Sequence, residues 1–270
     1  MEYSFTQLEK EFDRLGIELT DKKLVELNLL SSDGEVTYEG KLLSDQCTYG
    51  IKLIDYTDDG KVEVVTGSLI TQYITLKEKM IQISTEMKYP VKAVLEVIKN
   101  MVLHRDYTYN GDSIIRIYKD RIEFTSLGGL IGNLTVEGIE LGISVLRNFN
   151  LIKVFQEIGI TKGNGEGIQE ILSAYKEYKV KPVFKSIGGV FQVILPKPEY
   201  TINGKVISDK YRRVLEFVES RGTVSNKDIQ EHLELKSTSI VNYLKEMLEL
   251  ELIEKIREGR SISYKIKISK

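Results

Sequence analysis

The sequence has no tryptophan, one cysteine and two histidines among its 270 residues. A single cysteine excludes an internal disulfide framework, and Cys47, His104 and His232 are too few for a four-ligand zinc site built from cysteine and histidine. Such cysteine usage fits a reducing compartment, so we expect a cytoplasmic protein. We assign no chemical role to Cys47.

Long apolar runs are also missing. No stretch approaches the roughly 20 apolar residues that a membrane span requires. The first residues, MEYSFTQLEKEFDR, are acidic and amphipathic and lack the apolar centre of a signal peptide. We therefore expect neither export nor contact with a membrane. With 4 prolines and no low-complexity tract, the chain is expected to be folded nearly throughout.

Neither sign of charge is in large excess. The 38 Lys and Arg residues nearly balance the 40 Asp and Glu residues, which gives a formal net charge of -2. A protein that binds nucleic acid through its overall charge would be basic. Any nucleic-acid partner must therefore meet a local basic surface.

The length fits two or three domains, each able to bury its own core. We predict an N-terminal region of helices and a β-hairpin over residues 1–86, packing on a second domain at 87–200. A third, small domain is predicted at 205–270. Prolines and an Asn-Gly pair between residues 196 and 204 mark the linker before it.

The first motif lies in a helix that opens at Pro90. Glu96, Asn100 and His104 recur at spacings of four residues, so they face the same side of that helix. A carboxylate and an amide on one rigid surface could activate water and hold Mg²⁺ against a phosphate. The alternative is an ordinary solvent-exposed helix face. His104 lacks a nucleophile partner, which favours a structural hydrogen-bonding role.

The second motif is the glycine-rich loop Gly163-Asn164-Gly165-Glu166-Gly167, which directly opens an amphipathic helix. Its backbone N–H groups and the helix dipole point the same way, and such helix openings hold phosphates. The spacing differs from both the dinucleotide fingerprint and the P-loop, which excludes those two classes. The alternative is a helix start in which glycine supplies backbone freedom alone.

The third pattern fills the C-terminal segment. Apolar residues at helical spacing predict three helices, the second of them opened by Ser225 and Asp228 in a near capping box. Two β-runs follow, at 252–256 and 262–268, joined by a basic turn at 257–260. Three helices and a hairpin are typical of a winged helix. Such domains bind DNA, and they also serve as dimerisation or docking modules.

If the winged helix binds duplex DNA, its third helix would enter the major groove and its hairpin would contact the backbone. Residues 205–270 hold 14 Lys and Arg against 11 Asp and Glu, a modest local positive excess. The candidate contacts are polar or basic positions on the third helix and the wing: Lys236, Ser237, Thr238, Ser239, Asn242, Tyr243, Lys245, Arg257 and Arg260.

Four motifs in order carry a resemblance to a known family. They are Glu96-x-x-x-Asn100 running into His104-Arg-Asp-Tyr107, Asp120-Arg-Ile-Glu-Phe-Thr-Ser-Leu-Gly-Gly-Leu130, Arg147-Asn148, and Gly163-Asn-Gly-Glu-Gly-Ile168. With them, residues 50–200 resemble the C-terminal part of the RecG-helicase-related, Schlafen/AlbA-type family of bacterial transcriptional regulators. That part is similar to the GHKL ATP-binding fold of gyrase, MutL and sensor histidine kinases.

The resemblance implies an α/β sandwich that holds its ligand between helices and a mixed sheet. By analogy Glu96 is the water-activating carboxylate and Asn100 the magnesium ligand. The glycines of the two loops would contact the nucleotide: Gly128, Gly129, Gly163, Gly165 and Gly167. Where the superfamily uses an aspartate to recognise adenine, this chain has Ser126, a weaker acceptor. The AlbA-type module that usually precedes this region is expected to be absent.

The predicted fold class is therefore α+β: a GHKL-like sandwich with an N-terminal helical and β extension and a C-terminal winged helix-turn-helix domain. The first functional interpretation is a DNA-binding transcriptional regulator, a homodimer without enzymatic activity, whose nucleotide site is degenerate. The second is a Mg-dependent ATP-binding protein or weak ATPase of the GHKL type, with ATP and Mg²⁺ as cofactors. The third is a protein-interaction scaffold with no cofactor.

Overall fold

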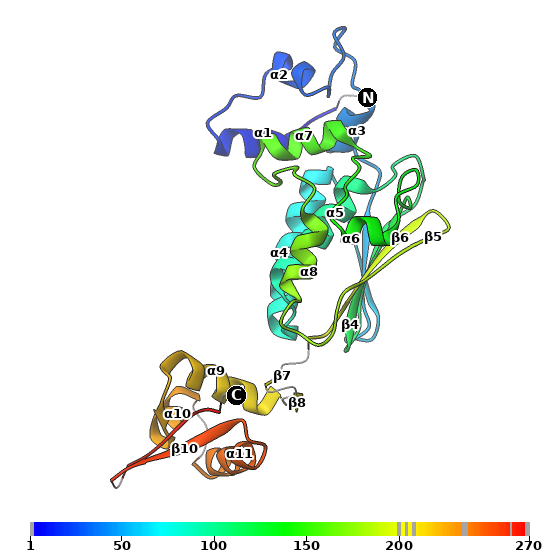
Figure 1. The fold of residues 1–270 in the computed structure, drawn as a ribbon. Coiled ribbons are helices and arrows are strands. Elements are labelled where there is room, and N and C mark those ends of the chain that lie inside the picture. Colours follow the sequence, from blue (N-terminus) through cyan, green and yellow to red (C-terminus); the bar gives the residue numbers. More distant parts are fainter. Residues whose placement is uncertain are drawn as a thin grey trace. The chain divides into compact units, whose positions relative to one another are not determined.

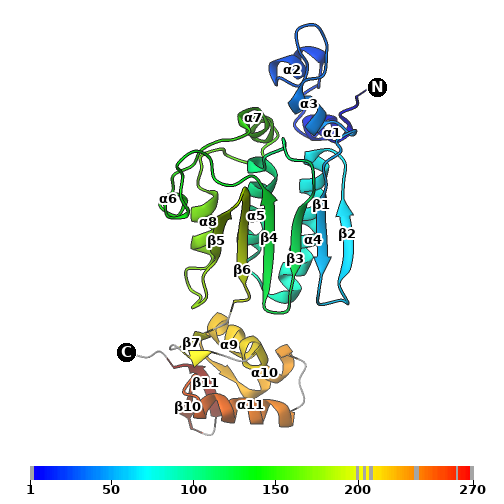
Figure 2. The same ribbon diagram turned by 90° about the vertical axis from the view of Figure 1, so that its right-hand side faces the viewer.

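The computed structural model describes residues 3–198, 201–202, 205–206, 209–233, 237–259 and 261–267. The chain divides into two compact units, residues 1–198 and 199–270. Figures 1 and 2 show the ribbon from two directions. Each unit is described by itself.

The first unit begins with three short helices, α1 (Thr6–Arg14), α2 (Asp21–Glu26) and α3 (Tyr38–Leu43). A β-hairpin and two long helices follow: β1 (Ile51–Asp55), β2 (Lys61–Val65), α4 (Leu69–Met87) and α5 (Val91–His104). The rest comprises β3 (Ser113–Ile117), β4 (Arg121–Leu127), α6 (Val136–Glu140), α7 (Phe149–Glu157), α8 (Gly167–Ala174), β5 (Val183–Ile187) and β6 (Val190–Pro196).

Six of these strands form one mixed sheet in the order β2-β1-β3-β4-β6-β5. Strand β1 runs parallel to β3, with Ile51 opposite Ser113, and every other neighbouring pair is antiparallel. The hairpin predicted within residues 1–86 is therefore an edge of this sheet and not a separate element packed on it. Residues from both predicted regions, 1–86 and 87–200, share a single hydrophobic core.

Helices α4, α5 and α8 cover one face of the sheet (Figures 1 and 2). Alternation along the strands directs apolar side chains toward them, since Ile122 and Phe124 of β4 are buried while their neighbours are less so. From the helical side, Val94, Ile98 and Met101 of α5 are buried against the sheet, as their spacing predicts. This mixed α+β sandwich is consistent with the predicted GHKL-like fold.

The second unit contains β7 (Thr201–Ile202), β8 (Lys205–Val206), α9 (Asp209–Arg221), β9 (Val224–Ser225), α10 (Asn226–Leu233), α11 (Ser237–Glu249), β10 (Ile253–Glu258) and β11 (Ser261–Ile266). Its three-stranded sheet has the order β10-β11-β9, and its helices enclose a core of their own. The predicted capping box is confirmed, because Ser225 N–H donates to Asp228 Oδ2 at 2.8 Å and Asp228 N–H donates back to Ser225 Oγ at 3.2 Å.

Membrane spans and clustered metal ligands are both missing from the described residues. No helix there combines the length and the apolar character needed to cross a bilayer. Within the same residues, no group of three or more histidine, cysteine, aspartate and glutamate side chains is placed to hold a metal ion.

Candidate nucleotide-binding site

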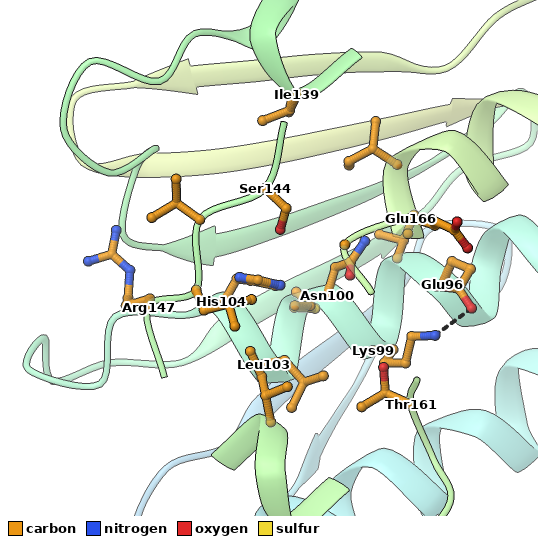
Figure 3. Close-up of a pocket in the computed structure, with 18 of the residues that line it drawn as sticks. Glu96, Lys99, Asn100, Leu103, His104, Ile139, Ser144, Arg147, Thr161 and Glu166 are labelled. Carbon is orange, nitrogen blue, oxygen red and sulfur yellow. Dashed lines mark hydrogen bonds and ion pairs between the residues drawn. The ribbon is translucent and has the colours of Figure 1, made fainter. Parts of the chain in front are cut away.

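A cavity of about 450 Å³ lies between helices α5 and α8, the sheet and the segment that links β4 to α7 (Figure 3). Its apolar walls come mainly from β4, β6 and the linking segment, and its polar groups come from α5 and the loop before α8. The polar and charged lining residues include Glu96, Lys99, Asn100, His104, Ser126, Arg147, Thr161, Lys162, Asn164, Glu166 and Glu170. This combination of apolar walls and a few convergent polar groups is typical of a small-molecule site.

Helix α5 supplies one side of the cavity. Glu96, Asn100 and His104 all line it, as their spacing of four residues predicts (Figure 3). The apolar stripe of the same helix faces the core, so these three polar side chains lie on its cavity side. The expectation of a merely solvent-exposed helix face is therefore wrong for Glu96, whose side chain is only 12% exposed.

Glu96 is held by an ion pair that the four-residue spacing does not include. Lys99 Nζ lies 2.6 Å from Glu96 Oε1, and the Lys99 side chain is only 16% exposed. The other carboxylate oxygen, Oε2, is buried and has no hydrogen-bond partner within the described part of the chain. Burial raises the pKa of Glu96 above its ordinary value; Lys99 opposes this shift and the nearby Glu170 reinforces it.

The glycine-rich loop meets Asn100 at Gly167, the first residue of α8. A Cβ atom on Gly167 would lie 2.9 Å from both amide atoms of Asn100, so only glycine allows this close approach. The first N–H groups of a helix have no partner within it. Helix α8 therefore presents backbone donors beside the Asn100 amide, which confirms that the loop opens a helix and places it next to α5.

The other two loop glycines are needed for backbone shape. Gly163 and Gly165 have φ angles of 66° and 77°, which side chains other than glycine rarely adopt. Each also packs closely, because a Cβ on Gly163 would overlap Gln156 Nε2 and a Cβ on Gly165 would lie 2.8 Å from Ser144 Cβ. All three loop glycines line the cavity, whereas their contact with phosphate stays a prediction.

Gly128 and Gly129 form the turn after β4 at the cavity rim. Gly128 has a φ of 96°, and a Cβ there would lie 2.6 Å from Asp106 Cβ. The Gly129 carbonyl accepts a hydrogen bond from Arg147 Nη2 at 2.6 Å. The turn is thus held from both sides by residues of two other motifs, the HRDY stretch and the Arg147-Asn148 pair.

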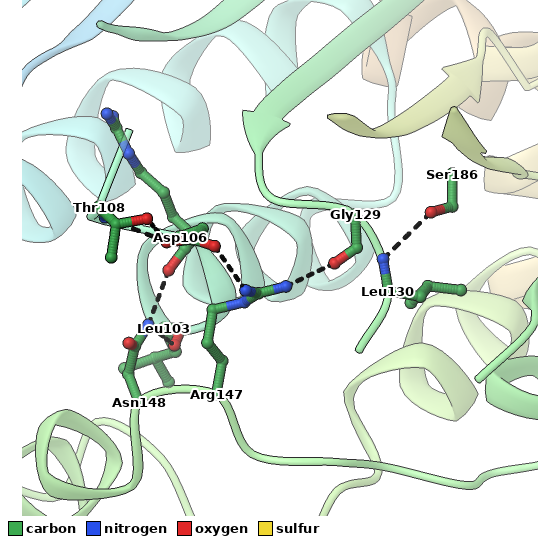
Figure 4. Close-up of polar contacts among 9 residues, drawn as sticks. Leu103, Asp106, Thr108, Gly129, Leu130, Arg147, Asn148 and Ser186 are labelled. Carbon is green, nitrogen blue, oxygen red and sulfur yellow. Dashed lines mark hydrogen bonds and ion pairs between the residues drawn. The ribbon is translucent and has the colours of Figure 1, made fainter. Parts of the chain in front are cut away.

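Arg147 and Asn148 tie the linking segment to the end of α5 (Figure 4). Arg147 Nη1 pairs with Asp106 Oδ2 at 2.7 Å, while Asn148 Nδ2 donates to the carbonyls of Leu103 and Arg105 at 2.9 and 2.8 Å. A hydrogen bond from the Thr108 hydroxyl is the main cause that lowers the pKa of Asp106, and the Arg147 charge adds to it. The ion-pair partner of Asp106 is thus Arg147, 41 residues further along the chain.

Arg105 is buried and serves the fold. It is 2% exposed and donates from Nη1 to Ser113 Oγ at 3.3 Å and from Nη2 to the carbonyls of Tyr109 and Gly111. Its guanidinium also lies 4.9 Å from the ring centre of Tyr49. These contacts shape the turn from α5 into β3.

His104 lines the cavity as a neutral imidazole. Its burial, and then the charge of Arg147, lower the pKa of the imidazole, so it is neutral at pH 7. Ser126 is buried on β4, next to the apolar side chain of Phe124 two residues earlier, and both line the cavity. The inward positions of β4 thus carry no carboxylate where the resemblance implies an adenine-reading aspartate.

The candidate DNA contacts lie in the second unit. Thr238, Asn242 and Lys245 of α11 are exposed, Ser239 is partly exposed, and Arg257 of β10 is exposed. Tyr243 is partly buried and packs edge-on against Tyr211, with ring centres 6.0 Å apart. Ser237 is the first residue of α11, and its side chain is not among those described. Lys236 and Arg260 lie outside the described residues.

Comparison with known families identifies the type of domain. Residues 111–195 match a family described as "Putative ATP-dependent DNA helicase recG C-terminal". These residues run from β3 to β6 and include the Gly128-Gly129 turn and the glycine-rich loop. The chain thus contains a RecG-related, GHKL-type ATPase-like domain.

One solved structure supports the fold. The DIP2311 protein from Corynebacterium diphtheriae is similar at 19% identity with a TM-score of 0.61, over 97% of this chain and 60% of that one. This chain therefore spans about three fifths of that protein. The histidine kinase AdeS from Acinetobacter baumannii matches at 11% identity with a TM-score of 0.28, over 72% of this chain and 74% of that one. Curated proteins gave no match.

Proposed function

We propose that the first unit binds a nucleotide together with Mg²⁺, as its ATPase-like domain suggests. The observation that carries the proposal is the meeting of Asn100 with the start of α8, which sets an amide oxygen beside free backbone N–H groups in one cavity. The helix start suits a phosphate, and the apolar walls around Phe124 and Phe191 suit a base.

The oxygen atoms that helix α5 presents to the cavity suit Mg²⁺ bound together with a nucleotide. Mg²⁺ keeps several waters and takes one or two protein oxygens plus phosphate oxygens. Asn100 would supply the amide oxygen, and the unpartnered Oε2 of Glu96 is a second oxygen on the same helix face. When bound, the ion would neutralise phosphate charge, while the protein's groups position the nucleotide.

Glu96 is the candidate water-activating carboxylate, but its surroundings weaken it as a base. Its Oε1 is engaged by the Lys99 ammonium, which holds that oxygen away from a water molecule. The proposed activity is accordingly binding with slow hydrolysis at most.

Isothermal titration calorimetry on the full chain, with ATP and ADP in the presence and absence of Mg²⁺, tests the proposal. We expect saturable binding that strengthens with Mg²⁺. Replacing Asn100 by alanine should weaken the Mg²⁺-dependent affinity at least about tenfold, since one oriented polar contact to a charged ligand contributes on the order of 1.5–3 kcal/mol. Asn110→Ala, at an exposed loop position, is the matched control. No heat with either nucleotide would refute the proposal.

A second function is favoured by the exposed face of α11. Thr238, Asn242 and Lys245 follow one another at helical spacing on that face. We propose that the second unit is a winged helix that places this face in the major groove of duplex DNA, with Arg257 of the wing against phosphates. Paired half-sites would require a homodimer, which light scattering measures.

Duplex binding is expected to weaken steeply with salt, since each phosphate contact releases counterions. Replacing Lys245 and Arg257 by alanine should reduce the affinity and lower the slope of log K against log salt by about 1 for each cation removed. Lys227→Ala is the matched control, because Lys227 is exposed on α10 and pairs with Glu231. Fluorescence anisotropy with genomic fragments measures both. Self-association without a shift at low salt would instead favour a scaffold.

A further inference from the structure

The Lys99–Glu96 ion pair lies inside the proposed nucleotide site. Both side chains line the cavity and come from the same helix, three residues apart. Figure 3 shows the Lys99 side chain extending past Thr161 toward Glu96, next to Asn100. With the Lys99 and Glu96 side chains only 16% and 12% exposed, the loss of their hydration offsets most of their attraction, so the pair adds little to stability. Stability alone therefore does not explain why the pair lies in a cavity.

The pair leaves Glu96 poorly satisfied. Lys99 contacts Oε1 only, and the buried Oε2 has no partner in the described part of the chain. Besides burial, the charge of the nearby Glu170 on α8 raises the pKa of Glu96, and Glu170 itself pairs with Lys92 at 3.7 Å. Two carboxyl groups thus lie near each other, and Lys99 is the cation that pairs with Glu96.

The other titratable groups around Glu96 do not neutralise its charge as the Lys99 ammonium does. From α4, Tyr73 is buried and its own pKa is raised by burial and by Glu96, so it stays neutral. His104 is neutral, and Arg147 is paired with Asp106. From the loop before α8 come Lys162 and Glu166, which are of opposite sign and both exposed. Lys99 is therefore the cation that compensates Glu96.

A nucleotide phosphate would compete for the same ammonium. Lys99 precedes Asn100 in sequence, and Asn100 faces the start of α8 where the phosphate is proposed to lie. A phosphate chain carries at least two negative charges, against one on a carboxylate. The four-carbon stem of lysine is flexible, so the ammonium can change partner without backbone movement.

On this basis, and resting on the proposed nucleotide site, we propose that Lys99 is an exchangeable phosphate ligand: it holds Glu96 in this structure and moves to the phosphate of a bound nucleotide. Glu96 then faces Glu170 without a cation. Nucleotide binding thereby competes with the Lys99–Glu96 ion pair.

The exchange predicts an effect of unusual sign for Glu96→Gln. Because the glutamine does not compete for the ammonium as a carboxylate does, this variant should bind ADP without Mg²⁺ more tightly than the wild type, by about threefold or more. Lys99→Met should bind about tenfold more weakly, and Lys99→Arg should retain most of the affinity, since it keeps the charge. The Lys99→Met background has no ammonium to release, so Glu96→Gln should no longer tighten the binding of ADP there.

Isothermal titration calorimetry with ADP, without Mg²⁺, measures the affinity of the wild type and of each variant. Circular dichroism confirms that the variants are folded.

The possible results separate the two proposals. Tighter ADP binding by Glu96→Gln, with loss of this effect in the Lys99→Met background, supports the exchange. ADP binding that is unchanged by Glu96→Gln overturns the exchange and leaves the nucleotide site intact. If the folded wild type binds neither ADP nor inorganic pyrophosphate, the nucleotide site is refuted and the exchange with it.

Discussion

Replacing Gly128 by alanine is expected to lower the free energy of unfolding of the first unit by about 3 kcal/mol. The φ of 96° strains any residue with a Cβ. In addition the Cβ would lie 2.6 Å from Asp106 Cβ and 2.9 Å from the Asp106 backbone nitrogen. Backbone cannot rotate away as a side-chain end can, so overpacking adds to the conformational cost.

Denaturant unfolding followed by circular dichroism measures this decrease. Gly16→Ala is the control, because Gly16 has a similar positive φ of 72° but nothing within 4 Å of its added Cβ. It should cost only about 1 kcal/mol, the conformational part alone. Equal effects at the two positions would contradict the close packing of the Gly128 turn on Asp106.

Replacing Gly167 by alanine should greatly weaken the affinity for nucleotide while leaving the fold nearly as stable as that of the wild type. The added Cβ would lie 2.9 Å from Oδ1 and Nδ2 of Asn100, and the end of that side chain can swing aside at small cost. It would then leave the position beside the start of α8. We expect affinity for ATP with Mg²⁺ to fall at least about tenfold, with a stability change below about 1 kcal/mol.

Ser173→Ala, on the exposed side of the same helix, should change neither quantity. Calorimetry and denaturant unfolding of the three proteins give the comparison. Wild-type affinity in Gly167→Ala would mean that Asn100 and the start of α8 do not jointly bind the nucleotide.

Local features were predictable because their causes are local. The alignment of Glu96, Asn100 and His104 follows from helical periodicity, and the cap formed by Ser225 and Asp228 follows from their spacing. The Lys99–Glu96 pair was accessible to the same reasoning, since residues three apart on a helix are neighbours. It was not predicted, because the nucleotide motif singles out positions four residues apart.

Long-range features could not be predicted in this way. The pairing of Arg147 with Asp106 joins residues 41 positions apart, and nothing local distinguishes it from a pair between Asp106 and Arg105. Arg105 instead turns to backbone carbonyls and Ser113 in the core. Likewise, the sequence of the β1–β2 hairpin indicates its turn but not its partner, because only tertiary packing sets β1 parallel to β3.

The most direct test of the nucleotide site is amide hydrogen exchange of the full chain with and without ADP and Mg²⁺. We predict slower exchange confined to residues 96–104 of α5, the turn at 128–130 and residues 161–170, which line the cavity. Slower exchange elsewhere with none in these three segments, or no change at saturating ADP, would contradict the presence of a nucleotide site in this cavity.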